Sequence, residues 1–142
     1  MECKPILVNA PNVSPAAGHY SHAMRAANLL FVSGQLGARA DGSHTADAPF
    51  EVQARQAIEN MLRIVQAAGA AIDDIAKVTI YVVDVENWPR LNAVYAEMMG
   101  DAKPARVVVP VPALHHGYLV EVEAIAVLAA DCLATTTRGL DR

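Results

Sequence analysis

Apolar residues recur at helical spacing in the middle of the chain, and this pattern restricts the fold more strongly than any other. Seven side chains spaced i, i+3, i+4 would share one helix face: Ala54, Ala57, Ile58, Met61, Leu62, Val65 and Ala68. Asp47 and Pro49 supply start signals, and Gly69 stands where a left-handed C-terminal cap is needed. The sequence therefore predicts an amphipathic helix that ends at Gly69.

Several further segments have the composition of regular elements. A shorter helix is predicted from about Pro89 to Met99, with Gly100 as its stop. Four runs rich in β-branched residues predict strands: Leu29–Ser33, Val78–Val83, Arg106–Val111 and Tyr118–Leu128. An extended piece, about Tyr20 to Ala26, is expected to pair with the first of these strands as a hairpin, across a turn at Ala27 and Asn28.

The order of these elements predicts an α+β fold, a mixed β-sheet with two helices packed on one face. Helices between strands permit parallel crossovers, and the short connection His115–Gly117 predicts an antiparallel pair between the last two strands. Such a sheet leaves its second face bare unless another subunit covers it. Hydrophobic residues make up 54% of the chain, and exchanging the 4 Tyr for the 8 Gly in this count gives about 57%, against an ordinary share of about 45–50% in the same count. This excess favours a homo-oligomer.

Length and charge limit the classes of protein to consider. We place one domain at residues 1–130 and a C-terminal tail at 131–142, where periodicity is lost. A net charge of −4 disfavours a nucleic-acid partner, because phosphate backbones would be repelled.

The longest apolar run is far below the roughly 18 residues of a membrane span. The first five residues lack the features of a secretory signal, and Cys3 and Cys132 form no CxxC motif, so we expect a cytoplasmic protein.

Two acidic residues in the last predicted strand are the best candidates for chemistry. Strand alternation puts Glu121 and Glu123 on one face, roughly 7 Å apart. If they are partly buried, one should have a raised pKa through desolvation and mutual repulsion. Arg106 opens the preceding strand, and a turn near His115 would place it roughly opposite the two acids. Two interpretations stay open: a cross-strand ion pair on a solvated edge, or a carboxylate-binding arginine beside a general base.

Other signatures of chemistry are missing from the sequence. The glycines at positions 34, 37 and 42 form neither a dinucleotide-binding motif nor a phosphate-binding loop. Ser33 lacks the flanking pattern of a nucleophile elbow. His19 and His22 would point to opposite faces of an extended segment, as would the adjacent His115 and His116. Turn or rim positions therefore explain these histidines better than a metal site.

A series of short blocks resembles the RidA (YjgF) family of enamine and imine deaminases. The blocks follow the family's order across about residues 18 to 128: Gly18–Ser21, Phe31–Gln35, Gln53–Ala57, Glu59–Asn60, Ala67–Ala70, Lys77–Tyr81, Leu91–Tyr95, Pro104–Arg106 and Val120–Ala126. Each block alone is weak, whereas the ordered series with its Pro-Ala-Arg block is specific to the family.

The resemblance implies a chorismate-mutase-like fold and a homotrimer with three ligand clefts between subunits. It implies hydrolysis of reactive enamines or imines to 2-oxo acids and ammonia, with no metal or organic cofactor. By matching position, Arg106 would bind the substrate carboxylate, and Glu121 would orient or activate water. The other positions expected to line the cleft are Tyr20, Ser33, Asn92 and Val108.

Some positions depart from the family pattern and leave the substrate open. Val107 and Val108 stand where archetypal deaminases have a small hydroxyl residue and often a cysteine, and His19 replaces a common proline. The segment Leu114–Gly117 differs from the usual Leu-Pro turn. The alternative to an enzyme is a non-catalytic trimer that binds a metabolite or a protein. Endoribonuclease activity, also described for family proteins, is disfavoured because the acidic chain offers no basic stripe.

Overall fold

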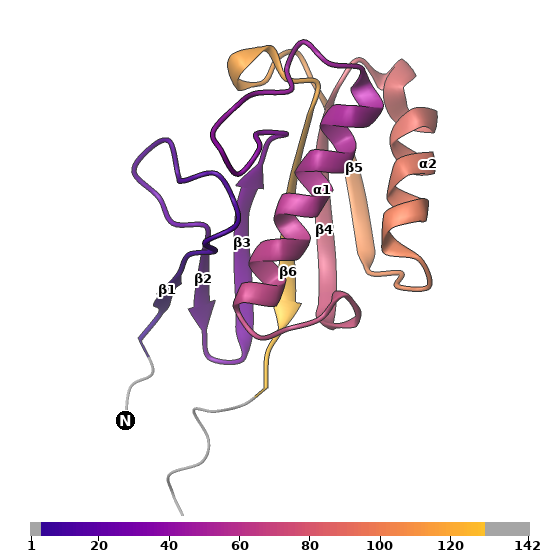
Figure 1. The fold of residues 1–142 in the computed structure, drawn as a ribbon. Helices are drawn as coiled ribbons and strands as arrows, with labels where there is room; N and C mark the ends of the chain where they lie inside the picture. Colours follow the sequence, from indigo (N-terminus) through magenta and orange to yellow (C-terminus); the bar gives the residue numbers. More distant parts are fainter. Residues whose placement is uncertain (1–3, 130–142) are drawn as a thin grey trace, which may run out of the picture.

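The computed structural model describes residues 4–129, which form a six-stranded sheet with two α-helices on one face (Figure 1). The elements in chain order are β1 (Ile6–Val8), β2 (Ala23–Ala26), β3 (Leu29–Gln35), α1 (Phe50–Ala67), η1 (Ile72–Asp74), β4 (Ile75–Val83), η2 (Val85–Asn87), α2 (Trp88–Met99), β5 (Ala105–Val111), η3 (His115–Gly117) and β6 (Val120–Val127). The predicted α+β architecture is confirmed. The predicted tail and both cysteines lie outside the described residues.

Glycines end both helices, as the sequence predicts. After α1, Gly69 has a φ of 86° and its N–H donates to the carbonyl of Gln66, while the N–H of Ala70 donates to Val65. A residue with a Cβ is strained in this left-handed conformation, so glycine is favoured. α2 ends at Gly100, whose φ is 59°.

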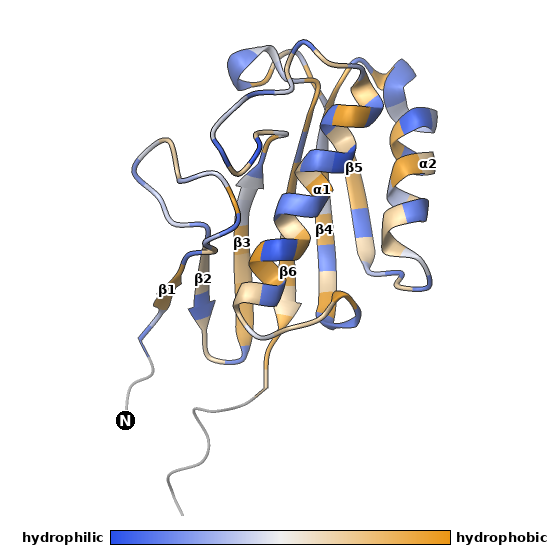
Figure 2. Cartoon of the chain, viewed as in Figure 1, coloured by the Kyte–Doolittle hydropathy of each residue, from blue (hydrophilic) through white to orange (hydrophobic). Residues whose placement is uncertain are grey.

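The apolar stripe of α1 is the centre of the core. Five of its seven predicted members are fully buried, Ala54, Ala57, Ile58, Met61 and Val65, while Leu62 and Ala68 are partly buried at the margin. Alternate residues of the central strands meet this stripe, among them Ile80 of β4 and Val122 of β6. Figure 2 shows the resulting pattern, with hydrophobic and hydrophilic residues on different sides of each helix. Burial between the helices and one face of the sheet therefore defines the fold.

The position of β6 corrects the predicted strand pairing. The sheet order is β1-β2-β3-β6-β4-β5, so β6 pairs antiparallel with both β3 and β4, and β5 pairs in parallel with β4. The expected antiparallel pair of the last two strands is wrong. The connection through η3 crosses the end of β4 rather than turning back beside β5, because a central position lets β6 pair its backbone groups on both edges.

Three other features of the sheet concern the predictions made from the sequence. The expected hairpin of β2 and β3 is confirmed, with Ala26 opposite Leu29. Strand β1 was not predicted, because its three residues are too few to show a pattern. In residues 4–129 no helix covers the second face of the sheet, and Phe31, Val107 and Val127 are each 42–43% exposed there. A single chain thus presents an uncovered apolar face, as expected.

We predict that equal truncations on the two sides of α1 have unequal effects on stability. Val65 is fully buried and Val52 is 40% exposed. Val65→Ala should lower the free energy of unfolding by about 2 kcal/mol, from lost apolar burial and the cavity left behind. Val52→Ala should change it by less than about 0.5 kcal/mol. Urea unfolding at one fixed protein concentration measures both, and equal losses would contradict this assignment of the core.

Candidate functional site

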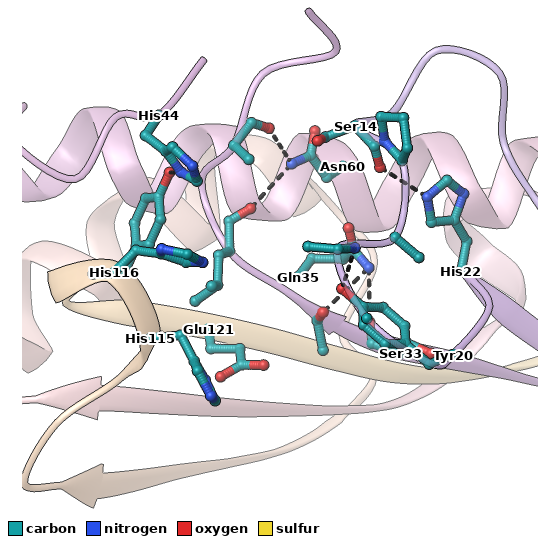
Figure 3. Close-up of a pocket in the computed structure, with 18 of the residues that line it drawn as sticks. Ser14, Tyr20, His22, Ser33, Gln35, His44, Asn60, His115, His116 and Glu121 are labelled. Carbon is teal, nitrogen blue, oxygen red and sulfur yellow. Dashed lines mark hydrogen bonds between the residues drawn. The ribbon is translucent and has the colours of Figure 1, made fainter. Parts of the chain in front are cut away.

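A cavity of about 670 Å³ lies at one end of the sheet, between β3, β6 and the loops around them (Figure 3). Its walls come from the segment before β2, the end of β3, the loop that follows β3, and the turn η3. Three of the six residues predicted for the site line it: Tyr20, Ser33 and Glu121. Arg106, Asn92 and Val108 are not among its lining residues.

A bulge in β3 shapes the cavity floor around Glu121. Three steps along β3, from Val32 to Gln35, match only two along β6, which is the geometry of one extra residue. A Cβ at Gly34 would overlap the Oε1 atom of Glu121, so any other residue here would displace the carboxylate from its present position. This role of Gly34 was not predicted, although a glycine inside a strand pattern is itself a signal of a bulge or close approach.

The carboxyl group of Glu121 is partly withdrawn from water. Burial raises its pKa, and the charge of Glu123 raises it further, while nearby His115 acts in the opposite direction. Desolvation disfavours the charged form of an acid, as expected for one of the two glutamates. A carboxyl group with a raised pKa can change between acid and base forms at a pH closer to neutrality.

Glu123 has a different environment. The hydroxyl of Tyr81 donates to Oε1 of Glu123 at 3.0 Å, and this bond raises the pKa of Tyr81 because the carboxylate favours the protonated phenol. Glu123 is not among the residues that line the cavity. The geometry therefore favours Glu121 over Glu123 as the acid that a ligand in the cavity would meet.

The remaining walls are held by hydrogen bonds to the backbone. The hydroxyl of Ser33 donates to the carbonyl of Ser21 at 2.6 Å. The ring of His22 accepts from the N–H of Ala10 at Nδ1 (2.9 Å), and its Nε2 lies 2.8 Å from the carbonyl of Ser14. His22 is 4% exposed, so its predicted turn or rim position is wrong. It satisfies backbone groups of the folded-back segment before β2.

Arg106 lies on the other side of the sheet, beside α2. It is in register with the buried Val78 of β4, so its side chain is on the helix side of the edge strand β5. Its Nη2 donates to Oδ1 of Asn92 at 3.1 Å, and the guanidinium carbon lies 4.7 Å from the ring centre of Tyr95 and 6.0 Å from that of Trp88. These contacts orient the cation and supply no carboxylate partner.

The predicted placement of Arg106 opposite Glu121 and Glu123 is wrong. β4 separates their strands, and the arginine and the acids are on opposite faces of the sheet. Within residues 4–129 no ion pair joins Arg106 to either acid. The six predicted residues form two groups: Tyr20, Ser33 and Glu121 in the cavity, and Asn92, Arg106 and Val108 between β5 and α2.

Two further residues that line the cavity were not predicted as site residues: His44 in the loop after β3, and Tyr118, which follows η3. Nδ1 of His44 lies 2.8 Å from the Tyr118 hydroxyl. The two residues are 74 positions apart in the sequence, so only the tertiary structure reveals this contact.

In the described part of the chain, no three His, Cys, Asp or Glu side chains are placed to hold a metal ion. Nor is any described helix both long and apolar enough to cross a membrane.

Known proteins are similar to this chain in both sequence and fold. The family model described as Endoribonuclease L-PSP matches residues 10–128. A RutC family protein of Pyrococcus horikoshii is 40% identical over 115 residues, which are 81% of this chain and 91% of the relative. A protein of Dermatophagoides farinae named 2-iminobutanoate/2-iminopropanoate deaminase is 32% identical over 122 residues, with 86% and 95% covered.

A solved structure, E. coli TdcF with bound serine, superposes with a TM-score of 0.82 at 30% identity, covering 87% of this chain and 99% of that one. The agreement thus extends from short blocks to the whole domain. Because the family model covers residues 10–128 and curated relatives exceed 30% identity over most of their length, this chain belongs to the RidA (YjgF) family.

Proposed function

We propose that this protein hydrolyses reactive enamine or imine acids to 2-oxo acids and ammonia, in clefts between the subunits of a homotrimer. One observation carries the proposal. Glu121 lies in an open cavity, and Arg106 stands at an edge strand with the neutral Asn92 as its hydrogen-bond partner. Each is half of a site for a small acid. A relative is named as an imine deaminase, and a solved neighbour holds serine, which supports a small 2-amino or 2-imino acid as ligand.

Assembly into a trimer would unite the two halves. Arg106 of one subunit would meet Glu121 of its neighbour, and the uncovered sheet face with Phe31 and Val107 would be buried in the same step. Burial of apolar surface favours such association. We further propose that the trimer works in the cytoplasm without a nucleic-acid partner, in keeping with its net charge of −4.

The side chains suit hydrolysis of a C=N bond. A guanidinium holds a carboxylate through two parallel hydrogen bonds, which would fix the neighbouring imine carbon. Glu121 as carboxylate would take a proton from water while the water oxygen bonds to the carbon of the protonated imine and the C=N electron pair moves to nitrogen. Glu121 as acid would then pass this proton to the nitrogen, and the C–N bond would break as the hydroxyl of the intermediate becomes the carbonyl and gives its proton to the departing ammonia. Asn92 and Tyr95 would hold the guanidinium in place.

We predict that Arg106→Ala lowers kcat/KM by roughly 10- to 150-fold, the equivalent of one charge-assisted hydrogen bond of about 1.5–3 kcal/mol. The assay supplies 2-iminobutanoate from a pyridoxal-phosphate dehydratase and follows ammonia release above the spontaneous rate. Arg55→Ala is the matched control, because Arg55 forms an exposed ion pair with Glu97. Equal rates for wild type and Arg106→Ala would refute this role. Tight 2-oxo acid binding without turnover would instead favour the non-catalytic trimer.

We predict that two impaired variants restore part of each other's lost activity if the site is shared between subunits. Arg106→Ala and Glu121→Gln, co-expressed with different tags and purified through both, form mixed trimers. Each mixed ring contains one interface with both intact halves, so about a third of wild-type activity should return. Mixed trimers no more active than the separate variants would show that both residues serve the same subunit's site, or that no such site exists.

We predict that the pH dependence of kcat/KM reports Glu121. Because burial raises its pKa, the base form is present above that raised pKa and is lost as the pH falls through it. The rate should fall on this acidic limb in wild type, and Glu121→Gln should abolish the limb. Glu123→Gln should keep the limb but move it to lower pH, because a neighbouring negative charge is removed. An unchanged limb in Glu121→Gln would exclude Glu121 as the base.

A further inference from the structure

Three histidines line one end of the cavity, and the proposed hydrolysis assigns them no role. His115 and His116 come from the turn η3, and His44 comes from the loop between β3 and α1 (Figure 3). The ring centres of His44 and His116 are 4.8 Å apart, and those of His115 and His116 are 6.5 Å apart. Segments more than seventy positions apart thus bring imidazole groups together beside Glu121.

A buried tyrosine holds this cluster in place. Tyr118 is 1% exposed, and its hydroxyl accepts from the N–H of Thr45 at 3.1 Å and lies 2.8 Å from Nδ1 of His44. We assign the hydroxyl hydrogen to the bond with Nδ1, which places the proton of a neutral His44 on Nε2. If His44 is charged, the hydroxyl accepts from Nδ1 instead, and Nε2 still carries a proton. With this assignment His44 offers an N–H donor at Nε2 in both states.

The backbone of the turn also favours this arrangement of rings. His116 has a φ of 58° and a ψ of 17°, in the left-handed region that residues with a Cβ seldom adopt. Its ring is tilted 32° against that of His44. A residue held in this conformation requires support from its surroundings, and such positions concentrate at ligand sites.

The volume of the cavity and its lining groups indicate which kind of ligand group suits the end lined by the three histidines. A volume of about 670 Å³ lies in the range that holds drug-sized ligands, about 300–1,000 Å³, and leaves room beyond a small imino acid. A hydrocarbon side chain would desolvate the imidazole N–H groups without pairing them. A carboxylate would accept from them. No lysine or arginine lines the cavity within the described residues, so imidazoles are the lining groups able to gain positive charge.

We propose that His44, His115 and His116 select imino acids that carry a second, distal carboxylate. The inference rests on the proposed function: the first carboxylate lies on Arg106 of the adjoining subunit, the C=N carbon lies beside Glu121, and the distal carboxylate accepts hydrogen bonds from the imidazoles. Glu121 is the acidic group that faces the histidines from β6. The histidines thus also separate two negative charges that would otherwise repel each other.

Two ligands of equal chain length test this selection. 2-Oxoglutarate and 2-oxopentanoate share five carbons and differ in their distal group, a carboxylate or a methyl. Calorimetry should show that the wild-type protein binds 2-oxoglutarate at least about tenfold more tightly, the effect of one charge-assisted hydrogen bond. The corresponding imines, supplied by an amino-acid oxidase, should differ in kcat/KM in the same direction.

Conservative variants assign the preference to the histidines. Asparagine retains a group able to bond Tyr118 at position 44, and it tolerates the left-handed backbone at position 116. The double variant His44→Asn/His116→Asn should lose the preference for 2-oxoglutarate while still binding 2-oxopentanoate, which shows that the site remains intact. His19→Asn makes the same change at an exposed histidine that does not line the cavity, and it should retain the preference.

The outcomes separate this inference from the function on which it rests. Equal wild-type affinity for the two acids, or a preference that survives in the double variant, overturns the selection by histidines. If 2-iminopentanoate is nevertheless hydrolysed through Arg106, the deaminase proposal stands alone. If neither acid binds and neither imine is hydrolysed faster than in buffer, both proposals fail.

Discussion

The position of β6 between β3 and β4 is the constraint on which the other features depend. Hydrogen bonds along both edges fix this strand, and its alternation then sends Val120, Val122, Ala124 and Ala126 into the core under α1. The same alternation sends Glu121 and Glu123 to the opposite face, where no helix in the described residues covers them. A strand at the centre of the sheet therefore also carries the acid proposed for catalysis, and the partial burial of that carboxyl group raises its pKa.

The separation of Arg106 from Glu121 within one subunit affects both the pKa of Glu121 and the availability of the Arg106 charge. An arginine paired directly with Glu121 would stabilise the carboxylate and lower its pKa, whereas burial and Glu123 raise it. Arg106 is instead oriented by a neutral amide and an aromatic ring, so its charge stays available for a ligand. Completion of the site between subunits would bring the two charges together with a substrate carboxylate between them. Assembly and catalysis would then be inseparable in this protein.

Members of one family can keep this arrangement and differ in what they accept. The bulge at Gly34 and the partners of Arg106 position Glu121 and Arg106, the two groups proposed to act on the substrate. The turn η3 and the loop after β3 lie outside this framework, and they bring His44, His115 and His116 together at one end of the cavity, beside Glu121. Loops tolerate substitution better than a buried strand does. A change of substrate is therefore expected in these loops rather than in β6.

The sequence by itself determined the local features of this protein. Helical spacing and terminal glycines predict α1 and α2, and alternation predicts that Glu121 and Glu123 share a face, because these features depend on residues a few positions apart. Only the tertiary structure decided that β6 enters between β3 and β4, which moves Arg106 away from the acids, and that His44 meets His116. Strand order and contacts between loops involve segments that are distant in the sequence. They depend on the burial and backbone pairing of the whole sheet, and no short sequence pattern encodes these.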